Sequence, residues 1–265
     1  MRPPAKQRSP LSIAQGDACA RGNADCSHSF LGGAMTRLLG SLLGVALLAT
    51  TSNGLGADFD VGRVTLRVTD DGWVSVGESG DALPFGGGRS GAIELTKRSL
   101  LLVDSANRFR AALVVSTTRG LPTIDVAWPA DCRSQDNVYA VDAHEGGADA
   151  RDCLRVTGLV AIERSLATDA PAVASDLAKR KIVVPTAGYV VLDEIALGNG
   201  AFVSIEALVA VDVELPGASA VQHSLPPGIK PEMVGWALRL AEAARSSIHS
   251  LSGLLVVPPL TAKAG

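Results

Sequence analysis

A loop bounded by two cysteines holds the residues best suited to chemistry. Hard cations such as calcium need several oxygen ligands from a flexible loop, and three carboxylates here could supply them, with an imidazole joining for a transition metal. The spacing matches no calcium-loop pattern, and exposed loops are commonly acidic. A calcium site and a solvated acidic loop therefore both stay open, and no other cofactor is indicated. The ligand set for the metal would be Asp142, His144, Glu145 and Asp149.

Two serines in glycine-rich surroundings raise the question of hydrolysis. Ser79 lies in GESGD and Ser90 in GRSGA, with His144 and His223 available as bases. A serine nucleophile needs a base and a strained strand-to-helix turn of the G-x-S-x-G kind, and neither segment has that spacing. We assign no catalytic residue from the sequence.

The cysteines divide into two pairs. Cys19 and Cys26 lie upstream of an apolar segment, and Cys132 and Cys153 lie downstream of it. Neither downstream cysteine belongs to a C-x-x-C or zinc-type spacing. An even pair in an oxidising compartment predicts a structural disulfide, Cys132–Cys153, which would stabilise the fold by roughly 3 kcal/mol.

The apolar segment predicts export. Residues 35–57 read MTRLLGSLLGVALLATTSNGLGA, with one positive charge and then an apolar run of about a dozen residues, which is too short to span a bilayer and typical of a signal peptide. Ala57 is a plausible cleavage point. Residues 1–34 form a leader without apolar periodicity, which is either not translated or removed, and residues 58–265 form a single domain.

The charge of that domain argues against a nucleic-acid partner. It keeps 19 Lys and Arg against 25 Asp and Glu, a net charge of −6. Nucleic-acid binding normally requires a basic stripe that neutralises phosphates, and here Lys179–Lys181 is the one basic run. Aromatic residues make up 4% of the chain, too few for stacking platforms.

Period-two alternation dominates the domain and predicts strands. Val64, Leu66 and Val68 alternate with polar residues, and a turn at 104–107 separates two β-branched runs in a hairpin. The glycine-rich segment 77–91 predicts a loop. The expected strands are 64–68, 73–76, 93–103, 108–117, 121–128, 138–141, 153–162, 182–184, 188–195 and 201–213.

Two segments predict helices. Residues 170–181 begin near a proline and end in basic residues. Residues 231–252 have an apolar stripe that includes Leu238 and Leu251, with Arg239, Glu242, Ser246 and His249 opposite. The sequence thus predicts an α+β fold: a mainly antiparallel sheet, curved or forming a partial barrel, with a C-terminal amphipathic helix packed on it.

These features suggest an exported protein, periplasmic or secreted, with a binding or accessory structural role in the bacterial envelope. Its partner would be an envelope protein or a small ligand, and it would meet the membrane only transiently through its signal peptide. Two alternatives stay open: an extracytoplasmic hydrolase with an unrecognised site, and a domain tethered to the membrane by an uncleaved signal.

Overall fold

The computed structural model places most of the predicted domain. All the described residues belong to the second of the two units into which the chain divides, Thr51–Gly265. The leader, most of the predicted signal peptide and its apolar run lie outside the described residues. Those described are 56–85, 91–120, 126, 128, 132, 137–143, 150–216, 225–250 and 252–260.

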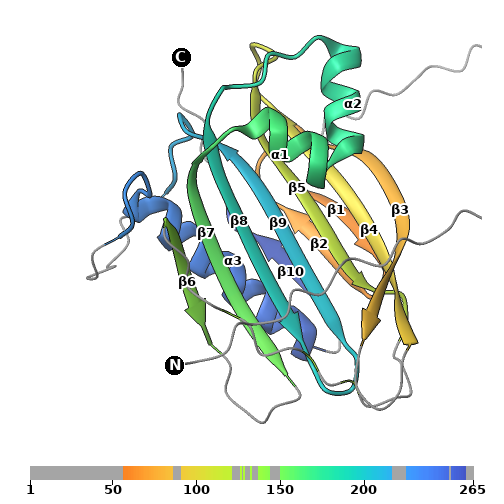
Figure 1. Cartoon of the computed structure of the whole chain (residues 1–265). Coiled ribbons are helices and arrows are strands. Elements are labelled where there is room, and N and C mark those ends of the chain that lie inside the picture. The colour runs from red at the N-terminus through yellow and green to blue at the C-terminus, as the bar shows by residue number, and fades with distance from the viewer. Residues whose placement is uncertain are drawn as a thin grey trace, which may run out of the picture. The chain divides into compact units, whose positions relative to one another are not determined.

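A seven-stranded sheet forms the centre of the fold (Figure 1), and all its pairings are antiparallel. The predicted hairpin at 104–107 is present, with Asn107 N donating to Asp104 O. In spatial order the strands are β3 (Trp73–Phe85), β4 (Gly91–Val103), β5 (Phe109–Thr118), β9 (Phe202–Ala210), β8 (Gly188–Ala196), β7 (Arg151–Val160) and β6 (Val138–Asp142).

A smaller sheet and the longest helix lie on one face of the large sheet. β1 (Ala57–Val61) pairs antiparallel with β2 (Val64–Val68), and β10 (Leu254–Val257) pairs parallel with β2. The side chains of Val64, Leu66 and Val68 are buried as the alternation predicts, and they join α3 (Pro231–His249) in the largest apolar cluster. The predicted fold class, a mainly antiparallel sheet with a C-terminal helix packed on it, is confirmed.

The helix α3 buries most of the apolar stripe that the sequence predicts, including Val234, Ala237, Ala241 and Ala244, but not the edge of that stripe at Leu238. It ends at His249 rather than at residue 252, and Leu238 is 37% exposed while Leu240 is fully buried. The buried stripe is centred on Trp236 and Leu240, because the indole N–H of Trp236 donates to Pro258 O at 3.1 Å and turns that face toward the sheet. In the part of the chain that the structure describes, no helix combines the length and apolarity needed to cross a membrane.

Two short helices cover one end of the opposite face (Figure 1). α2 (Pro171–Arg180) matches the predicted helix 170–181, with proline in its first turn and Lys181 in a left-handed conformation after its end. α1 (Ile162–Asp169) was not predicted, since the sequence placed residue 162 in a strand. It buries only Ile162 and Leu166, and one i, i+4 pair is too little periodicity to reveal a helix.

The glycine-rich segment after Val76 is a strand as far as Phe85, so the loop predicted for 77–91 is wrong over 77–85. The remainder, 86–90, lies outside the described residues. β4 is 13 residues long, and β3 forms antiparallel pairs with it as far as Phe85. This pairing keeps residues 77–85 extended. Glu78 and Arg98, directly opposite each other, form an ion pair that supports this pairing.

Other segments also depart from the predicted strands. Residues 182–184 contribute one isolated bridge, Val183 with Arg108, rather than a strand. Of the expected strand 121–128 the structure describes Val126 and Trp128, which are buried but not in a strand. β10 was not predicted: Gly253, at a φ of 59°, reverses the chain after α3, and its carbonyl accepts from Thr65 N at 3.0 Å.

The position of the buried stripe on α3 can be tested with two leucines of the same helix. Leu240→Ala removes a fully buried side chain and should lower the free energy of unfolding by about 3 kcal/mol. Leu238→Ala, at the partly exposed position, should change it by less than about 1 kcal/mol. Urea unfolding followed by tryptophan fluorescence measures both, and the reverse order of the two effects would contradict this position.

Candidate functional site

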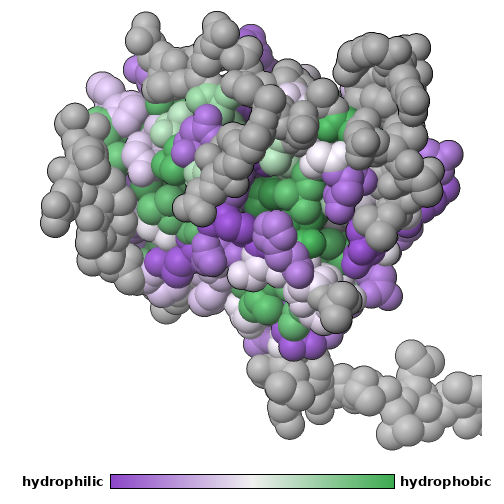
Figure 2. Space-filling view, turned by 90° about the horizontal axis from the view of Figure 1, so that it is seen from below, coloured by the Kyte–Doolittle hydropathy of each residue, from purple (hydrophilic) through white to green (hydrophobic). Residues whose placement is uncertain are grey.

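A pocket of about 440 Å³ opens where several segments end at one edge of the fold. Strands β6 and β8 end there and β7 begins there, beside the last turns of α3 (Figure 1). Figure 2 looks at the molecule from this end and shows hydrophobic residues gathered in the middle with hydrophilic residues beside them. The described lining residues are Ala143, Ala150, Arg151, Asp152, Ile195, Leu197, Glu242, Arg245 and His249.

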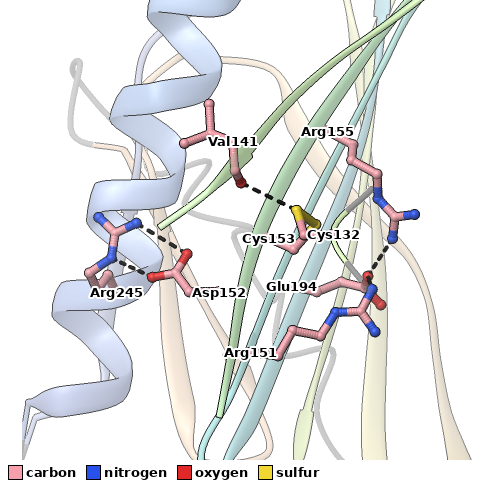
Figure 3. The surroundings of a disulfide bond; sticks show 8 residues. All are labelled: Cys132, Val141, Arg151, Asp152, Cys153, Arg155, Glu194 and Arg245. Carbon is pink, nitrogen blue, oxygen red and sulfur yellow. Dashed lines mark hydrogen bonds and ion pairs between the residues drawn. A yellow bond between two sulfur atoms is a disulfide. The ribbon is translucent and has the colours of Figure 1, made fainter. Parts of the chain in front are cut away.

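A bidentate ion pair forms one wall of this pocket. Arg245 of α3 donates from Nε and Nη2 to the two carboxylate oxygens of Asp152 on β7, at 2.6 and 3.1 Å (Figure 3). The hydrogen bonds that Arg245 donates to the Asp152 carboxylate raise the pKa of Arg245 further above its usual range. Paired guanidinium and carboxylate groups have a fixed geometry, so this contact holds the end of α3 against the sheet.

Three polar residues of α3 face the pocket together. Glu242, Arg245 and His249 are spaced by three and four residues, which places them on one side of the helix. Glu242 accepts from Arg245 Nη1 at 2.5 Å. The sequence analysis placed Glu242 and His249 on a solvent-facing side. Both are exposed, but the fold adds a strand edge beside them and makes them part of a pocket wall.

A second ion-pair cluster joins β7 to β8 on the sheet face opposite α3. Arg151 and Arg155 both donate to Glu194 Oε2, at 2.6 and 2.7 Å (Figure 3). These residues alternate with Asp152 and Asp193, so successive positions on each strand face opposite sides of the sheet. The two clusters therefore fix the same pair of strands from both faces.

The predicted Cys132–Cys153 disulfide is present and lies between these clusters (Figure 3). Cys153 is fully buried and directly opposite Glu194 on β8. Cys132 Sγ lies 3.4 Å from the carbonyl oxygen of Val141 on β6. The bridge thus ties the segment before β6 to β7, next to the pocket residues Arg151 and Asp152.

A buried carboxyl group lies beneath the ion-paired wall. Asp193 on β8 is 0% exposed, and neither of its oxygens has a hydrogen-bond partner among the described residues. Burial raises its pKa to about 7, Asp152 and Glu194 raise it as like charges, and Arg245 lowers it. The sequence contains a signal for it: Asp193 interrupts the buried alternation of Tyr189, Val191 and Ile195.

Glu206 is a second carboxyl group with a displaced pKa. It lies on β9, and burial raises its pKa to about 7, with Asp169 raising it further and Lys97 lowering it. Lys97 Nζ donates to the carbonyl oxygen of Asp169 at 3.3 Å, at the end of α1. This group is not among the described residues of the pocket lining, and its raised pKa makes stability depend on pH.

The predicted metal ligands are only partly placed. Asp142 ends β6, is exposed, and pairs in register with Cys153. His144, Glu145 and Asp149 lie outside the described residues. Within the described ranges, no group of three or more His, Cys, Asp or Glu side chains could hold a metal ion. The calcium site therefore stays a prediction of the sequence.

Of the two serines considered for catalysis, the structure describes Ser79, which is not among the described lining residues of the pocket. Ser79 lies in the edge strand β3, opposite Lys97, rather than in a loop. Ser90 and His223 lie outside the described residues, as does His144. Sequence reasoning instead missed Arg245 and Asp193, the charged groups that the fold brings to Asp152.

Comparisons with known proteins find no match for this chain. No protein-family model matches the chain. No curated protein matches it, and no solved structure does. The described part is thus defined as a disulfide-containing α+β protein with a polar pocket beside its C-terminal helix.

Replacing the disulfide should destabilise the domain without changing its topology. The Cys132→Ser/Cys153→Ser chain should lose about 3 kcal/mol of unfolding free energy, because the open loop gains conformational entropy in the unfolded state. Chemical denaturation under non-reducing conditions measures the loss. Addition of a reductant should destabilise the original chain by a similar amount and leave the variant unchanged, and equal midpoints for the original and variant chains would contradict this role.

The raised pKa values predict that stability falls as the pH rises from about 4 to about 7. Below this window the Asp193 carboxyl is protonated in both the folded and the unfolded chain. Within the window it ionises only in the unfolded chain, and this favours unfolding. Above about pH 7 both states are ionised and the loss is constant, on the order of 4 kcal/mol for a three-unit difference in pKa.

Unfolding free energies between pH 5 and 8 test this dependence. Asp193→Asn should make the decline shallower, and Glu206→Gln should do so independently, because Glu206 is the other group whose pKa rises to about 7. An Asp193→Asn chain with the same slope as the original chain would contradict the assignment.

Proposed function

We propose that this protein is an exported, non-catalytic binding protein, and that the pocket between α3 and the strand edge takes a small polar molecule without net charge. The feature that carries the proposal is the paired state of the pocket's charged groups. Arg245 is shared by Asp152 and Glu242, and Arg151 is paired with Glu194. A ligand therefore meets a wall of fixed donors and acceptors in which the charges offset one another.

The size and composition of the pocket support a small ligand. About 440 Å³ falls within the ordinary range for small-molecule sites. Four of the nine described lining residues are apolar: Ala143, Ala150, Ile195 and Leu197. A molecule with one apolar group and one polar end would contact both parts of this lining.

The state of the carboxylates supports binding over hydrolysis. Asp152 accepts through both oxygens from Arg245, and Glu242 accepts from the same guanidinium. Both carboxylates are thus already held by a guanidinium group, which fixes their position in the pocket wall. The pocket is thus better suited to holding a molecule than to reacting with it. Export, predicted by the apolar segment 38–49, would place this binding in the periplasm or outside the cell.

A set of four probes with the same apolar group tests the ligand class. L-Leucine is zwitterionic, 4-methylpentanamide is neutral, 4-methylpentanoate is an anion and 3-methylbutylamine is a cation. Calorimetric titration should show binding of the zwitterion or the amide and at least tenfold weaker binding of the two singly charged probes, because each would bring an uncompensated charge into a balanced site. Tighter binding of either ion would contradict the class, and no binding by any probe would contradict the pocket's proposed role.

Two positions on α3 supply a matched pair of variants. His249→Ala removes an exposed pocket side chain and should lower the affinity for whichever probe binds by roughly tenfold. Ser246→Ala changes another exposed position of the same helix, outside the described lining, and should leave affinity unchanged. Both variants should keep the thermal stability of the original chain, so that a loss of binding reports on the pocket and not on folding.

A further inference from the structure

Asp193 occupies a position where an ionised carboxylate is poorly tolerated. Its neighbours in register are Leu154 on β7 and Ile205 on β9, both buried and apolar. It is fully buried and accepts no hydrogen bond from any residue that the structure describes. A buried charge without a partner is strongly unfavourable, whereas the protonated acid avoids most of that cost.

Among the described residues, one cation acts on this carboxyl group, and another carboxylate already holds that cation. Asp152 pairs in register with Ile195, two positions along β8 from Asp193, so the two aspartates are diagonal neighbours on the face that α3 covers. Arg245 of α3 binds Asp152 with two hydrogen bonds and also attracts Asp193. Glu194, the next residue on β8, belongs to the opposite face and adds a like charge.

We propose that Asp193 is a proton-operated switch for the contact between Arg245 and Asp152. With Asp193 protonated, Arg245 stays on Asp152 and Glu242 and holds the end of α3 against β7. When Asp193 gives its proton to solvent, its carboxylate competes with Asp152 for the guanidinium. Arg245 then turns toward the sheet, Glu242 is released, and the polar wall of the pocket opens.

The competition follows from the number of charges in the cluster. Before ionisation, one guanidinium serves two carboxylates, Asp152 and Glu242, and Glu242 is largely exposed to water. Ionisation adds a third carboxylate in a position without water, where electrostatic interactions are stronger. Breaking the contact between Arg245 and Glu242 costs the least free energy, because Glu242 is exposed and water can replace that contact. The ion pair between Arg245 and Glu242 should therefore break before the one between Arg245 and Asp152.

The displaced titration of Asp193 places this event near neutral pH, since its pKa is raised to about 7. Its consequence for ligand affinity rests on the proposed function of the pocket, whereas the movement of Arg245 does not. A binding site whose wall depends on a proton would bind and release its ligand at different pH values.

Nuclear magnetic resonance of the ligand-free chain, with its disulfide intact, tests the switch directly. The side-chain carboxyl carbon of Asp193 should titrate with a midpoint near pH 7, and the Nε resonance of Arg245 should shift with the same midpoint. In Asp193→Asn the Arg245 resonance should stay constant between pH 5 and 9. An Arg245 resonance that is constant in the original chain, or that titrates equally in the Asp193→Asn chain, would overturn the proposal.

Three neighbouring variants check that the cluster is the cause. Asp152→Asn removes a like charge and should lower the Asp193 midpoint by on the order of one pH unit, and Arg245→Gln should raise it by a similar amount. Glu242→Gln should lower the midpoint by less than Asp152→Asn does, because it removes only the exposed contact that Arg245 gives up, and Glu242 is not among the charges that act directly on Asp193. Equal midpoints in the Asp152→Asn chain and the original chain would overturn the coupling.

Because these measurements use no ligand, they separate the two proposals. A coupled titration of Asp193 and Arg245 together with no probe binding would support the switch and contradict the proposed function. Probe binding with the same affinity at pH 6 and pH 8, together with a constant Arg245 resonance, would support the pocket and overturn the switch.

Discussion

The docking of α3 on the large sheet is the constraint on which the rest of the structure depends. Its apolar face completes the largest core cluster, which also contains side chains from both sheets. Two polar contacts fix its orientation: the indole N–H of Trp236 on Pro258 O near the start, and the guanidinium of Arg245 on Asp152 near the end. Apolar burial supplies most of the free energy and selects the apolar side of the helix, and these hydrogen bonds fix its exact rotation and where its ends lie.

The same docking creates the pocket. The pocket needs both parts: β7 and β8 supply the strand edge, and the last turns of α3 supply the wall beside it. The strands at this edge are held from both sides, by Arg245 with Asp152 on one face and by Glu194 with two arginines on the other, with the disulfide adjacent. Such support keeps the polar groups in position before a ligand arrives, which reduces the entropy lost on binding. Asp193 is the exception within this supported region, since it is a carboxyl group without a hydrogen-bond partner among the described residues.

The errors of sequence reasoning occur where pairing or packing overrules composition. Residues 77–85 are rich in turn-forming types, yet they form a strand because β4 extends beside them. Leu238 fits an apolar stripe as well as Leu240 does, and the helix alone cannot distinguish them, because both stripes have helical spacing. The sheet distinguishes them by the side of α3 that it covers. α1 and β10 are too short to show a period, and each forms because a neighbouring surface is available to it.

The sequence by itself determined the features that depend on local pattern and covalent chemistry. Alternation identified β2 and the β4–β5 hairpin, apolar periodicity identified α3, and an even pair of cysteines identified the disulfide. Only the tertiary structure decided the site. Asp152 and Arg245 are 93 residues apart, and His249 and Ile195 belong to elements with no local relation. Local pattern reports how a segment folds, whereas a pocket depends on which distant segments meet, and that is settled by the packing of the whole core.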